Sequence, residues 1–316
     1  MNFPRLPALM LALSAAFGVQ LHAAAQSQPV RPAKAAESGD LADARKGFRT
    51  TLVRKMPAQP PIPAPPAEVF KLVSYDAAPG QLGAYLTPDP RDGKQHPAII
   101  WITGGDSNSI DALWQPGPDS NDQTASAYRK AGIVMMFPSL RGGNDNPGVR
   151  EGFLGEVDDV LAAASYLARQ AYVDPDRIYL GGHSTGGTLA LLTAEISTRF
   201  RAVFAFGPVE DIDGYGGRFT GFNPANPREA ALRSPGRWLE SVRSPVFVIE
   251  GAGGNIDSLL AMRSATRNQH IRFIPVHGAD HFNVLAPANR QIAQKILLDS
   301  GPATNITLSP AQMAPR

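Results

Sequence analysis

The segment Arg177-Ile-Tyr-Leu-Gly-Gly-His-Ser-Thr-Gly-Gly-Thr-Leu-Ala-Leu-Leu192 places a serine between a short apolar run and a second apolar run of small residues. Within it, residues 182–186 follow the pattern G-x-S-x-G. A serine on a sharp strand-to-helix turn has strained backbone angles, so its neighbours must lack bulky side chains. Its hydroxyl is then exposed to a base, and the next backbone N–H faces the developing oxyanion, aided by the helix dipole. The segment predicts a nucleophile at Ser184 rather than a plain glycine-rich turn. The phosphate-loop patterns G-x-G-x-x-G and G-x-x-x-x-G-K-[ST] are absent from it.

From about residue 69 onward, apolar strands alternate with helices of regular apolar spacing. Strands are predicted at 69–75, 81–87, 98–103, 133–137, 177–180, 202–206, 246–250 and 271–276, and helices at 124–130, 153–169, 184–198, 258–268 and 288–299. Near-continuous apolar strands between helices indicate a parallel sheet covered on both faces. The prediction is therefore an α/β fold with a mostly parallel sheet of about eight strands, and its chemistry lies at the carboxyl ends of the strands.

Composition narrows the possible functions. The 316 residues are 43% hydrophobic and 18% charged, a globular balance that argues against wholesale disorder. A net charge of +2 is too small to create the positive field that a nucleic-acid groove requires. The chain has no cysteine, which excludes disulfides, thiolate metal sites and a cysteine nucleophile.

The first 25 residues have the layout of a secretory signal. Arg5 supplies the positive end, an apolar stretch follows, and Ala23-Ala24-Ala25 provides small residues for cleavage. The strongest apolar run, residues 8–19, is shorter than the roughly 20 residues needed to cross a bilayer. We therefore expect a cleaved signal, rather than a membrane anchor, and export to a periplasm or to the medium.

The remaining chain divides into three parts. Residues 26–67 are rich in Pro and Ala and predict a disordered tether. Residues 68–300 form the expected catalytic domain, and residues 301–316 are expected to be a disordered tail. Within the domain, residues 208–244 break the strand–helix alternation and are rich in Gly, Pro and Arg. They predict an insertion or partial lid, with an ordinary long connection as the alternative.

The predicted strand-to-helix turn around Ser184, here called the elbow, resembles the nucleophile elbow of the α/β-hydrolase superfamily. The resemblance runs from about residue 69 to 300. Two further segments are similar to prolyl-oligopeptidase catalytic domains: Phe137-Pro-Ser-Leu-Arg-Gly-Gly143 and Gly155-Glu-Val-Asp-Asp-Val-Leu-Ala-Ala163. Those domains carry a comparable aromatic-Arg-Gly turn and a Val-Asp-Asp helix, and one of these carboxylates is expected to pair with Arg141. Dienelactone-hydrolase-like esterases are close relatives. The resemblance implies the α/β-hydrolase fold and a serine nucleophile.

A serine at its ordinary pKa is a poor nucleophile and needs a base within hydrogen-bond reach. His281 lies in the loop between the last strand and the last helix, where the resemblance places that base, and His277 is the alternative. A metal site formed by these two histidines is disfavoured, because Gly278 interrupts the helix that such spacing requires. No metal or cofactor is expected.

The acid that orients the base should follow the strand at 246–250. The resemblance puts the family's Asp at Asn255, but an Asn in that role favours the wrong imidazole tautomer. We therefore predict Asp257, two residues on, although an Asp at a helix start is also explained by the helix dipole. Further candidates remain open: Asn255 itself, Glu250, Asp211 and Asp213.

Two backbone donors are expected to face the oxyanion: the N–H of Thr185, and that of Gly104 or Gly105 after the strand at 98–103. The resemblance implies a further tyrosine hydroxyl, but Leu140 stands at its position. A missing donor costs about 3 kcal/mol of transition-state stabilisation. This departure weakens the case for amide hydrolysis more than that for ester hydrolysis.

Together these features predict an exported serine hydrolase with Ser184 as nucleophile, His281 as base and Asp257 as orienting acid. The expected substrate is a small-molecule ester or a short peptide, with neither nucleic acid nor stable membrane insertion involved. Two alternatives stay open. One is a prolyl-oligopeptidase-like serine peptidase, and the other is a catalytically impaired binding protein on the same fold.

Overall fold

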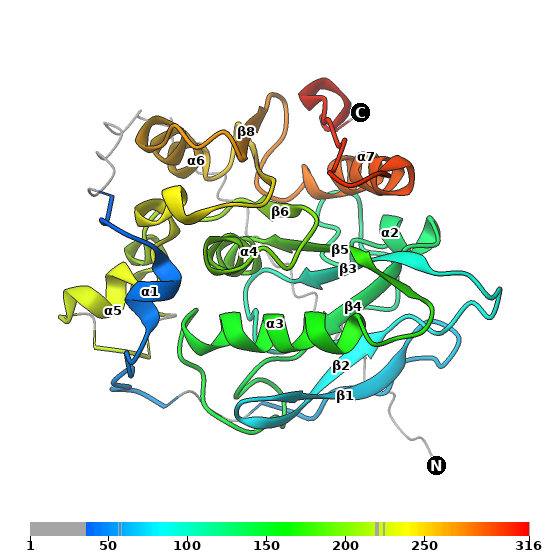
Figure 1. The fold of residues 1–316 in the computed structure, drawn as a ribbon, viewed down its shortest axis with the longest axis horizontal. Coiled ribbons are helices and arrows are strands. Elements are labelled where there is room, and N and C mark those ends of the chain that lie inside the picture. Colours follow the sequence, from blue (N-terminus) through cyan, green and yellow to red (C-terminus); the bar gives the residue numbers. More distant parts are fainter. Residues whose placement is uncertain (1–35, 56, 58, 219–220, 224, 316) are drawn as a thin grey trace, which may run out of the picture. The chain divides into compact units, whose positions relative to one another are not determined.

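A computed structural model of the chain describes residues 36–315 except 56, 58, 219–220 and 224 (Figure 1). The predicted signal at 1–25 lies outside the described residues. An eight-stranded sheet runs in the order β1-β2-β4-β3-β5-β6-β7-β8. Its strands are β1 (Lys71–Ala77), β2 (Gly80–Leu86), β3 (His96–Ile102), β4 (Val134–Pro138), β5 (Val173–His183), β6 (Val203–Phe206), β7 (Val246–Gly251) and β8 (Ile271–Val276).

The sheet is antiparallel only at one edge. β1 and β2 form a hairpin, β2 pairs antiparallel with β4, and all pairs from β4 to β8 are parallel. The hairpin turns at Gly80, whose φ of +131° is costly for a residue with a side chain. The predicted mostly parallel sheet is confirmed, and β5, which carries the elbow, lies at its centre.

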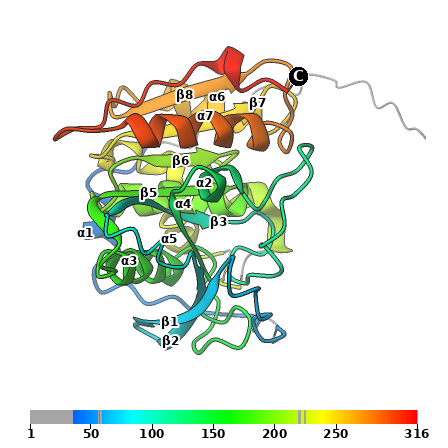
Figure 2. The same cartoon turned by 90° about the vertical axis from the view of Figure 1, so that its right-hand side faces the viewer.

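Helices cover both faces of the sheet, and Figure 2 shows α2 and α7 on its near side. The helices are α1 (Leu41–Arg45), α2 (Ala127–Lys130), α3 (Gly155–Leu167), α4 (Thr185–Ile196), α5 (Pro227–Ala231), α6 (Ile256–Ala265) and α7 (Leu285–Leu298). Two separate apolar clusters result. One joins the sheet to α3, α4 and α6, and the other joins it to α2 and α7. Successive β3 residues enter opposite clusters, Ile100 the first and Trp101 the second, because strand side chains alternate between faces.

The prediction of a disordered tether was wrong for its described C-terminal part. Leu41 of α1 is fully buried, and its N–H donates to Ser241 Oγ over 3.1 Å. Farther on, the Thr51 N–H and the Thr50 hydroxyl donate to the two carboxylate oxygens of Glu229 over 2.7 and 2.9 Å. A segment with few apolar residues is ordered here because the domain supplies a pocket for one leucine and acceptors for its polar groups.

The predicted disorder of the tail at 301–316 was also wrong for residues 301–315. Ile306 and Met313 are buried in the cluster beneath α7, and a 3₁₀ turn, η4 (Pro310–Gln312), precedes Met313. The carboxylate of Asp299 accepts from the Thr304 hydroxyl (2.8 Å) and the Asn305 N–H (3.0 Å). Packing across the domain, which local composition does not report, fixes this segment.

The predicted insertion at 208–244 contains α5 and three 3₁₀ segments: η1 (Ile212–Arg218), η2 (Pro235–Arg237) and η3 (Leu239–Ser241). A fully buried ion pair between Glu229 and Arg233 holds it together. The Val53 and Arg54 N–H groups donate to Gly221 O over 2.8 and 3.2 Å. The wall beside the site is therefore formed by two segments, the insertion and residues 50–54.

Glu195, on the helix that follows the elbow, yields a prediction about stability. Its side chain is 1% exposed, and neither carboxylate oxygen has a hydrogen-bond partner among the described residues. Burial disfavours the charged form and raises the pKa of Glu195 well above its ordinary 4.5. The unfolded chain ionises above that pH while the folded chain keeps the proton, so folding loses stability as the pH rises.

We therefore expect Glu195→Gln, which cannot ionise, to gain stability relative to the wild type by about 1.4 kcal/mol for each pH unit above 4.5, until the pKa of the folded state is reached. Urea unfolding of both proteins at pH 5 and pH 8 measures this difference. An equal difference in free energy of unfolding at the two pH values would show that Glu195 does not titrate on unfolding.

Candidate active site

Ser184 occupies a strained turn between β5 and α4. Its φ of 55° and ψ of −115° lie where residues with side chains are rarely found. A Cβ on Gly182 would lie 2.4 Å from Gly186 O, and a Cβ on Gly186 would lie 2.3 Å from Ile102 O. The two glycines of the motif are therefore required by contact, as the sequence predicted, and the half-buried serine stands at the carboxyl end of the central strand.

His281 lies in the loop between β8 and α7 and pairs with Glu250 at the end of β7. His281 Nδ1 is 2.9 Å from Glu250 Oε2. The Glu250 side chain is 1% exposed, and its other oxygen accepts the Gly251 N–H over 2.7 Å. Gly207 and Gly254 make room for this pair, since a Cβ on either would lie 2.4 Å from a Glu250 carboxylate oxygen.

The serine and the histidine both lie against the carboxyl end of β6. The Ser184 N–H donates to Phe206 O over 2.8 Å. The next residue, Gly207, lies against the imidazole, and a Cβ there would be 2.5 Å from His281 Cε1. Ser184, which follows β5, and His281, which follows β8, therefore lie at the same edge of the sheet, each against residues 206–207. His277, the alternative base, is exposed.

The structure does not bring Asp257 to His281. Asp257 is exposed in the first turn of α6, the position that the helix dipole explains. Asn255 donates to Gly207 O over 3.3 Å. Asp211 lies 3.7 Å from Arg237 Nη2, and Asp213 is exposed. The carboxylate that contacts His281 Nδ1 is that of Glu250.

A sequence signal for Glu250 was present. In Val246-Phe-Val-Ile-Glu250, a lone carboxylate ends an otherwise apolar buried strand. Burying a carboxylate is costly without a partner, so an acid at this position implies one nearby. The expectation of an acid in the following loop obscured this signal.

The turn after β3 that carries Gly104 and Gly105, here called the oxyanion turn, lies beside the serine. A Cβ on Gly104 would be 3.2 Å from Ser184 Cβ. The Gly104 N–H, one of the predicted donors, instead donates to Gln123 Oε1 over 2.9 Å. Gly105 faces the elbow, and its carbonyl accepts from the Thr185 hydroxyl over 3.0 Å. The N–H groups of Thr185 and Gly105 are therefore the candidate donors, and Gly104 is not.

A tyrosine that the sequence analysis did not single out reaches the nucleophile. The Tyr215 hydroxyl of η1 lies 2.7 Å from Thr188 Oγ1 and is hydrogen-bonded to the Ser184 side chain. Its ring stacks on Phe153, with centroids 5.6 Å apart and planes 14° apart. Burial raises the pKa of Tyr215, so the hydroxyl keeps its proton and can donate. Leu140, which stands where the resemblance implies a tyrosine, is fully buried.

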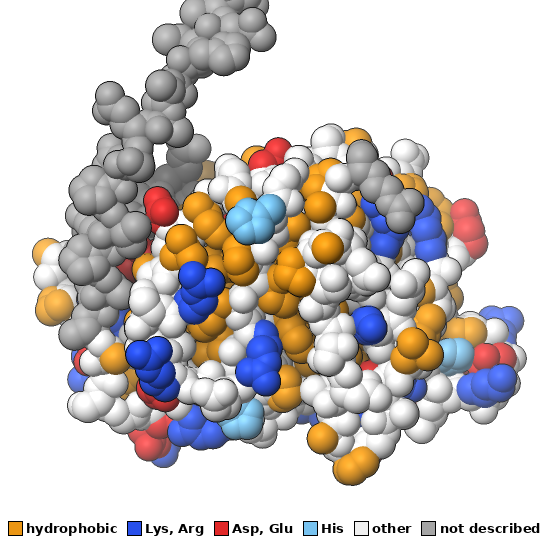
Figure 3. Space-filling view, turned by 90° about the horizontal axis from the view of Figure 1, so that it is seen from above, with side chains coloured by type: hydrophobic (Ala, Val, Ile, Leu, Met, Phe, Trp, Pro, Cys, Tyr) orange, Lys and Arg blue, Asp and Glu red, His pale blue; other side chains and the backbone are white. Residues whose placement is uncertain are grey.

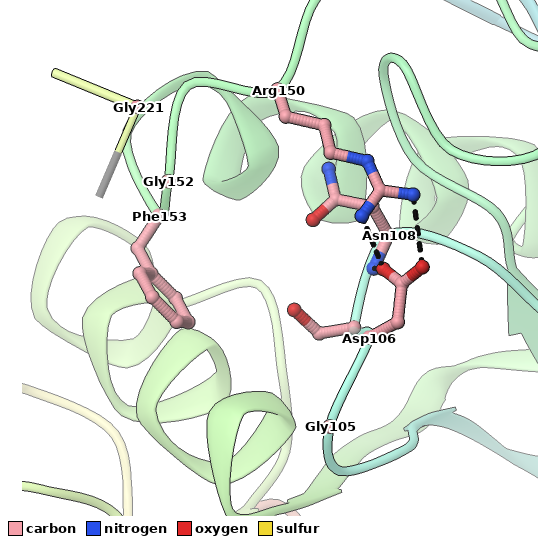
Figure 4. A pocket seen from close by; sticks show the side chains of 8 residues that line it. Gly105, Asp106, Asn108, Arg150, Gly152, Phe153 and Gly221 are labelled. Atoms are coloured by element: carbon pink, nitrogen blue, oxygen red, sulfur yellow. Dashed lines mark hydrogen bonds and ion pairs between the residues drawn. The ribbon is translucent and has the colours of Figure 1, made fainter. Parts of the chain in front are cut away.

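A small pocket opens beside Gly105, and Figure 4 shows Phe153 on one side of it and Asp106 and Arg150 on the other. Arg150 Nη1 and Nη2 donate to the two oxygens of Asp106 over 2.7 and 2.9 Å, a bidentate pair that fixes the turn. Arg141 makes a similar pair with Asp159 of α3, as expected from the sequence.

Charge is dispersed on one face of the molecule (Figure 3). On the face shown in Figure 3, Lys and Arg side chains are scattered among apolar and uncharged ones. Within the described residues, no three His, Asp or Glu side chains are grouped so as to hold a metal ion. No helix among those residues has the length and apolarity to cross a membrane.

Parts of the chain are similar to known proteins. Residues 119–251 match the prolyl oligopeptidase family. A probable dipeptidyl-aminopeptidase B of Talaromyces marneffei is 26% identical over 228 residues, which cover 69% of this chain and 22% of that protein. The uncharacterized peptidase YtmA of Bacillus subtilis is 27% identical over 179 residues, which cover 52% of this chain and 66% of YtmA.

Among solved structures, a puromycin-hydrolyzing peptidase of Mycobacterium tuberculosis superposes with a TM-score of 0.59 at 19% identity, over 72% of this chain and 39% of that one. At this identity the likeness concerns the fold. The chain thus has the fold of these α/β-hydrolase structures, as predicted. Its residues 119–251 are similar to the prolyl oligopeptidase family, and the matched part of the chain spans only 22% and 66% of the two curated relatives.

Proposed function

We propose that this chain is a serine peptidase that cleaves short peptides through an acyl-enzyme, with Ser184, His281 and Glu250 as its triad. The observation that carries the proposal is the buried Glu250 carboxylate on His281 Nδ1, at the point of the sheet edge where the strained serine stands. This arrangement leaves His281 Nε2 as the basic nitrogen for the serine proton.

In the proposed reaction, His281 Nε2 takes the Ser184 proton as the oxygen attacks the scissile carbonyl. Glu250 accepts the Nδ1–H bond throughout and stabilises the imidazolium. The N–H groups of Thr185 and Gly105 donate to the oxyanion. His281 then returns the proton to the leaving amine, and water repeats the sequence to release the acyl group from Ser184.

The space near the site supports a short peptide. A cavity of about 560 Å³ lies between residues 52–55, 57 and 59 and the loop at 142–150, and it shares Arg150 with the small pocket beside Gly105. Binding sites for small ligands commonly range from about 300 to 1,000 Å³. The named peptidases among the relatives favour amides, and the same machinery would cleave activated esters, which demand less of the oxyanion donors.

Dipeptidyl and aminoacyl anilides, assayed beside p-nitrophenyl esters of increasing acyl length, test this proposal. We expect turnover of at least one peptide anilide and faster turnover of the esters. Hydrolysis of esters without hydrolysis of any anilide would indicate a serine esterase instead of a peptidase. A folded wild-type protein that turns over neither class would favour the binding-protein alternative.

We further propose that Tyr215 supplies the hydroxyl donor that Leu140 cannot. Tyr215→Phe keeps the ring stacked on Phe153 and removes only the hydroxyl. We expect kcat for an anilide to fall about 100-fold, the usual effect of losing one oxyanion donor, with a small change in KM. Tyr166→Phe, on α3, is the matched control. An unchanged kcat in Tyr215→Phe would exclude this role.

Export remains part of the proposal, supported by the pattern of residues 1–25. Expression of the full chain with N-terminal sequencing of the purified product tests it. We expect a mature terminus shortly after Ala25, whereas an intact Met1 would contradict cleavage.

A further inference from the structure

Gln123 connects the oxyanion turn to the loop that carries the base. It lies between β3 and α2, and the Trp101 indole N–H donates to its carbonyl over 3.0 Å. Its side-chain Oε1 accepts the Gly104 N–H over 2.9 Å. Its Nε2 lies 2.8 Å from His183 Nδ1, and His183 Nε2 lies 2.9 Å from the carbonyl oxygen of His281.

The bonds fix the direction of every proton along this connection. Because a backbone N–H can only donate, the Gln123 oxygen must face Gly104, and its NH₂ group must face His183. The NH₂ group donates to Nδ1, so the single proton of neutral His183 lies on Nε2 and is donated to the His281 carbonyl. The second Gln123 N–H is also used, by Asn121 Oδ1 at 2.7 Å.

His183 is held neutral by its surroundings. It is 1% exposed, and its ring centroid lies 4.4 Å from that of His281. Burial, followed by repulsion from His281, lowers the pKa of His183 to about 3. A neutral ring at this position leaves His281 free to become an imidazolium during acylation, since no positive charge stands beside it.

We propose that Gln123 is a positioning residue for the reaction. It fixes the position of the oxyanion turn relative to the His281 loop, and it holds His183 as the neutral Nε2–H tautomer. This inference rests on the proposed function. By engaging the Gly104 N–H, the amide also orients the turn so that the Gly105 N–H is left for substrate. Neither role requires Gln123 to touch the reacting atoms.

Two substitutions separate these roles. Gln123→Met removes both bonds of the amide, and we expect kcat to fall about 10- to 100-fold with KM little changed, because the donors lose their geometry. Gln123→Glu keeps an acceptor for the Gly104 N–H, but it places a carboxylate oxygen against the unprotonated Nδ1 of His183, so that two acceptors face each other. A proton is then needed to bridge them, so we expect the pKa of His183 to rise by about 2 or more.

The experiment measures kcat and KM against pH, and the pKa of His183 by NMR titration of the imidazole signals, in the wild type and both variants. Gln170→Met, which removes a half-buried glutamine from the turn after α3, is the matched control. In Gln123→Glu we expect an added ionisation in the kcat/KM profile at the new pKa of His183. Gln123→Met and the control should lack it.

Two results would overturn the inference. One is a wild-type kcat in Gln123→Met, and the other is a pKa of His183 in Gln123→Glu that equals its pKa in the wild type. Because the titration needs no substrate, it tests the tautomer even if the chain hydrolyses nothing, in which case the proposed function alone has failed. If Gln123→Met does not fold, Gln123→Glu, which retains the Gly104 contact, carries the test.

Discussion

Ser184→Ala is expected to lower kcat by about 10⁶-fold, the largest loss of any substitution in the chain. Loss of the nucleophile in a serine triad removes nearly all covalent catalysis, and the oxyanion donors and substrate binding leave a small residual rate. Substrate affinity should change little, because the deleted atom is one oxygen on a turn whose shape is set by Gly182 and Gly186. Stopped assays of the best anilide at high enzyme concentration measure this loss.

Ser165→Ala, on the exposed side of α3, is the control for this substitution, since its hydroxyl bonds only within its own helix. It should retain wild-type kcat. Comparable activity in Ser184→Ala and the wild type would mean that hydrolysis occurs at another site or through another nucleophile.

Glu250→Gln is expected to lower kcat by about 10⁴-fold. The two side chains have the same shape, but an amide can present its NH₂ group to Nδ1 and favour the imidazole tautomer that has no free Nε2 lone pair for the serine proton. The amide also fails to stabilise the imidazolium. The corresponding change in a Ser-His-Asp protease, a general example of this chemistry, costs about the same factor.

Asp257→Asn is the decisive comparison, because it makes the same chemical change at the carboxylate that chain order favours. We expect near-wild-type kcat, since this exposed side chain lies in the first turn of α6. A large loss in Asp257→Asn with little effect in Glu250→Gln would contradict the assignment of Glu250 and restore that of Asp257.

The elbow and the sheet were predictable from sequence because local rules determine both. The glycines at 182 and 186 are demanded by backbone contacts within one turn, and the strands are continuous apolar runs. Helix ends were less well defined: α2 begins at Ala127 rather than at residue 124, and α6 ends at Ala265 rather than at 268. Caps and fraying at such ends depend on contacts that periodicity does not contain.

The acid and the oxyanion donors depended on contacts between distant segments. Glu250 reaches His281 only because Gly207, which follows β6, leaves space for both side chains. The Gly104 N–H is engaged by an amide nineteen positions later in the sequence. Tyr215 arrives from an insertion without a regular pattern. In each case the tertiary arrangement, rather than the local motif, selects the residue.

The binding-protein alternative depends on Asn255 and Leu140, which depart from the pattern that the resemblance implies. With Glu250 on His281 and the Tyr215 hydroxyl beside Ser184, neither Asn255 nor Leu140 now implies a missing group.

Covalent labelling with a fluorophosphonate, followed by mass spectrometry of the intact and trypsin-digested protein, tests most directly whether the bent serine is an activated nucleophile. We predict one adduct per chain, on the tryptic peptide spanning residues 178–199, and none in Ser184→Ala. A folded wild-type chain that stays unlabelled, or that carries its label on another peptide, would contradict the account.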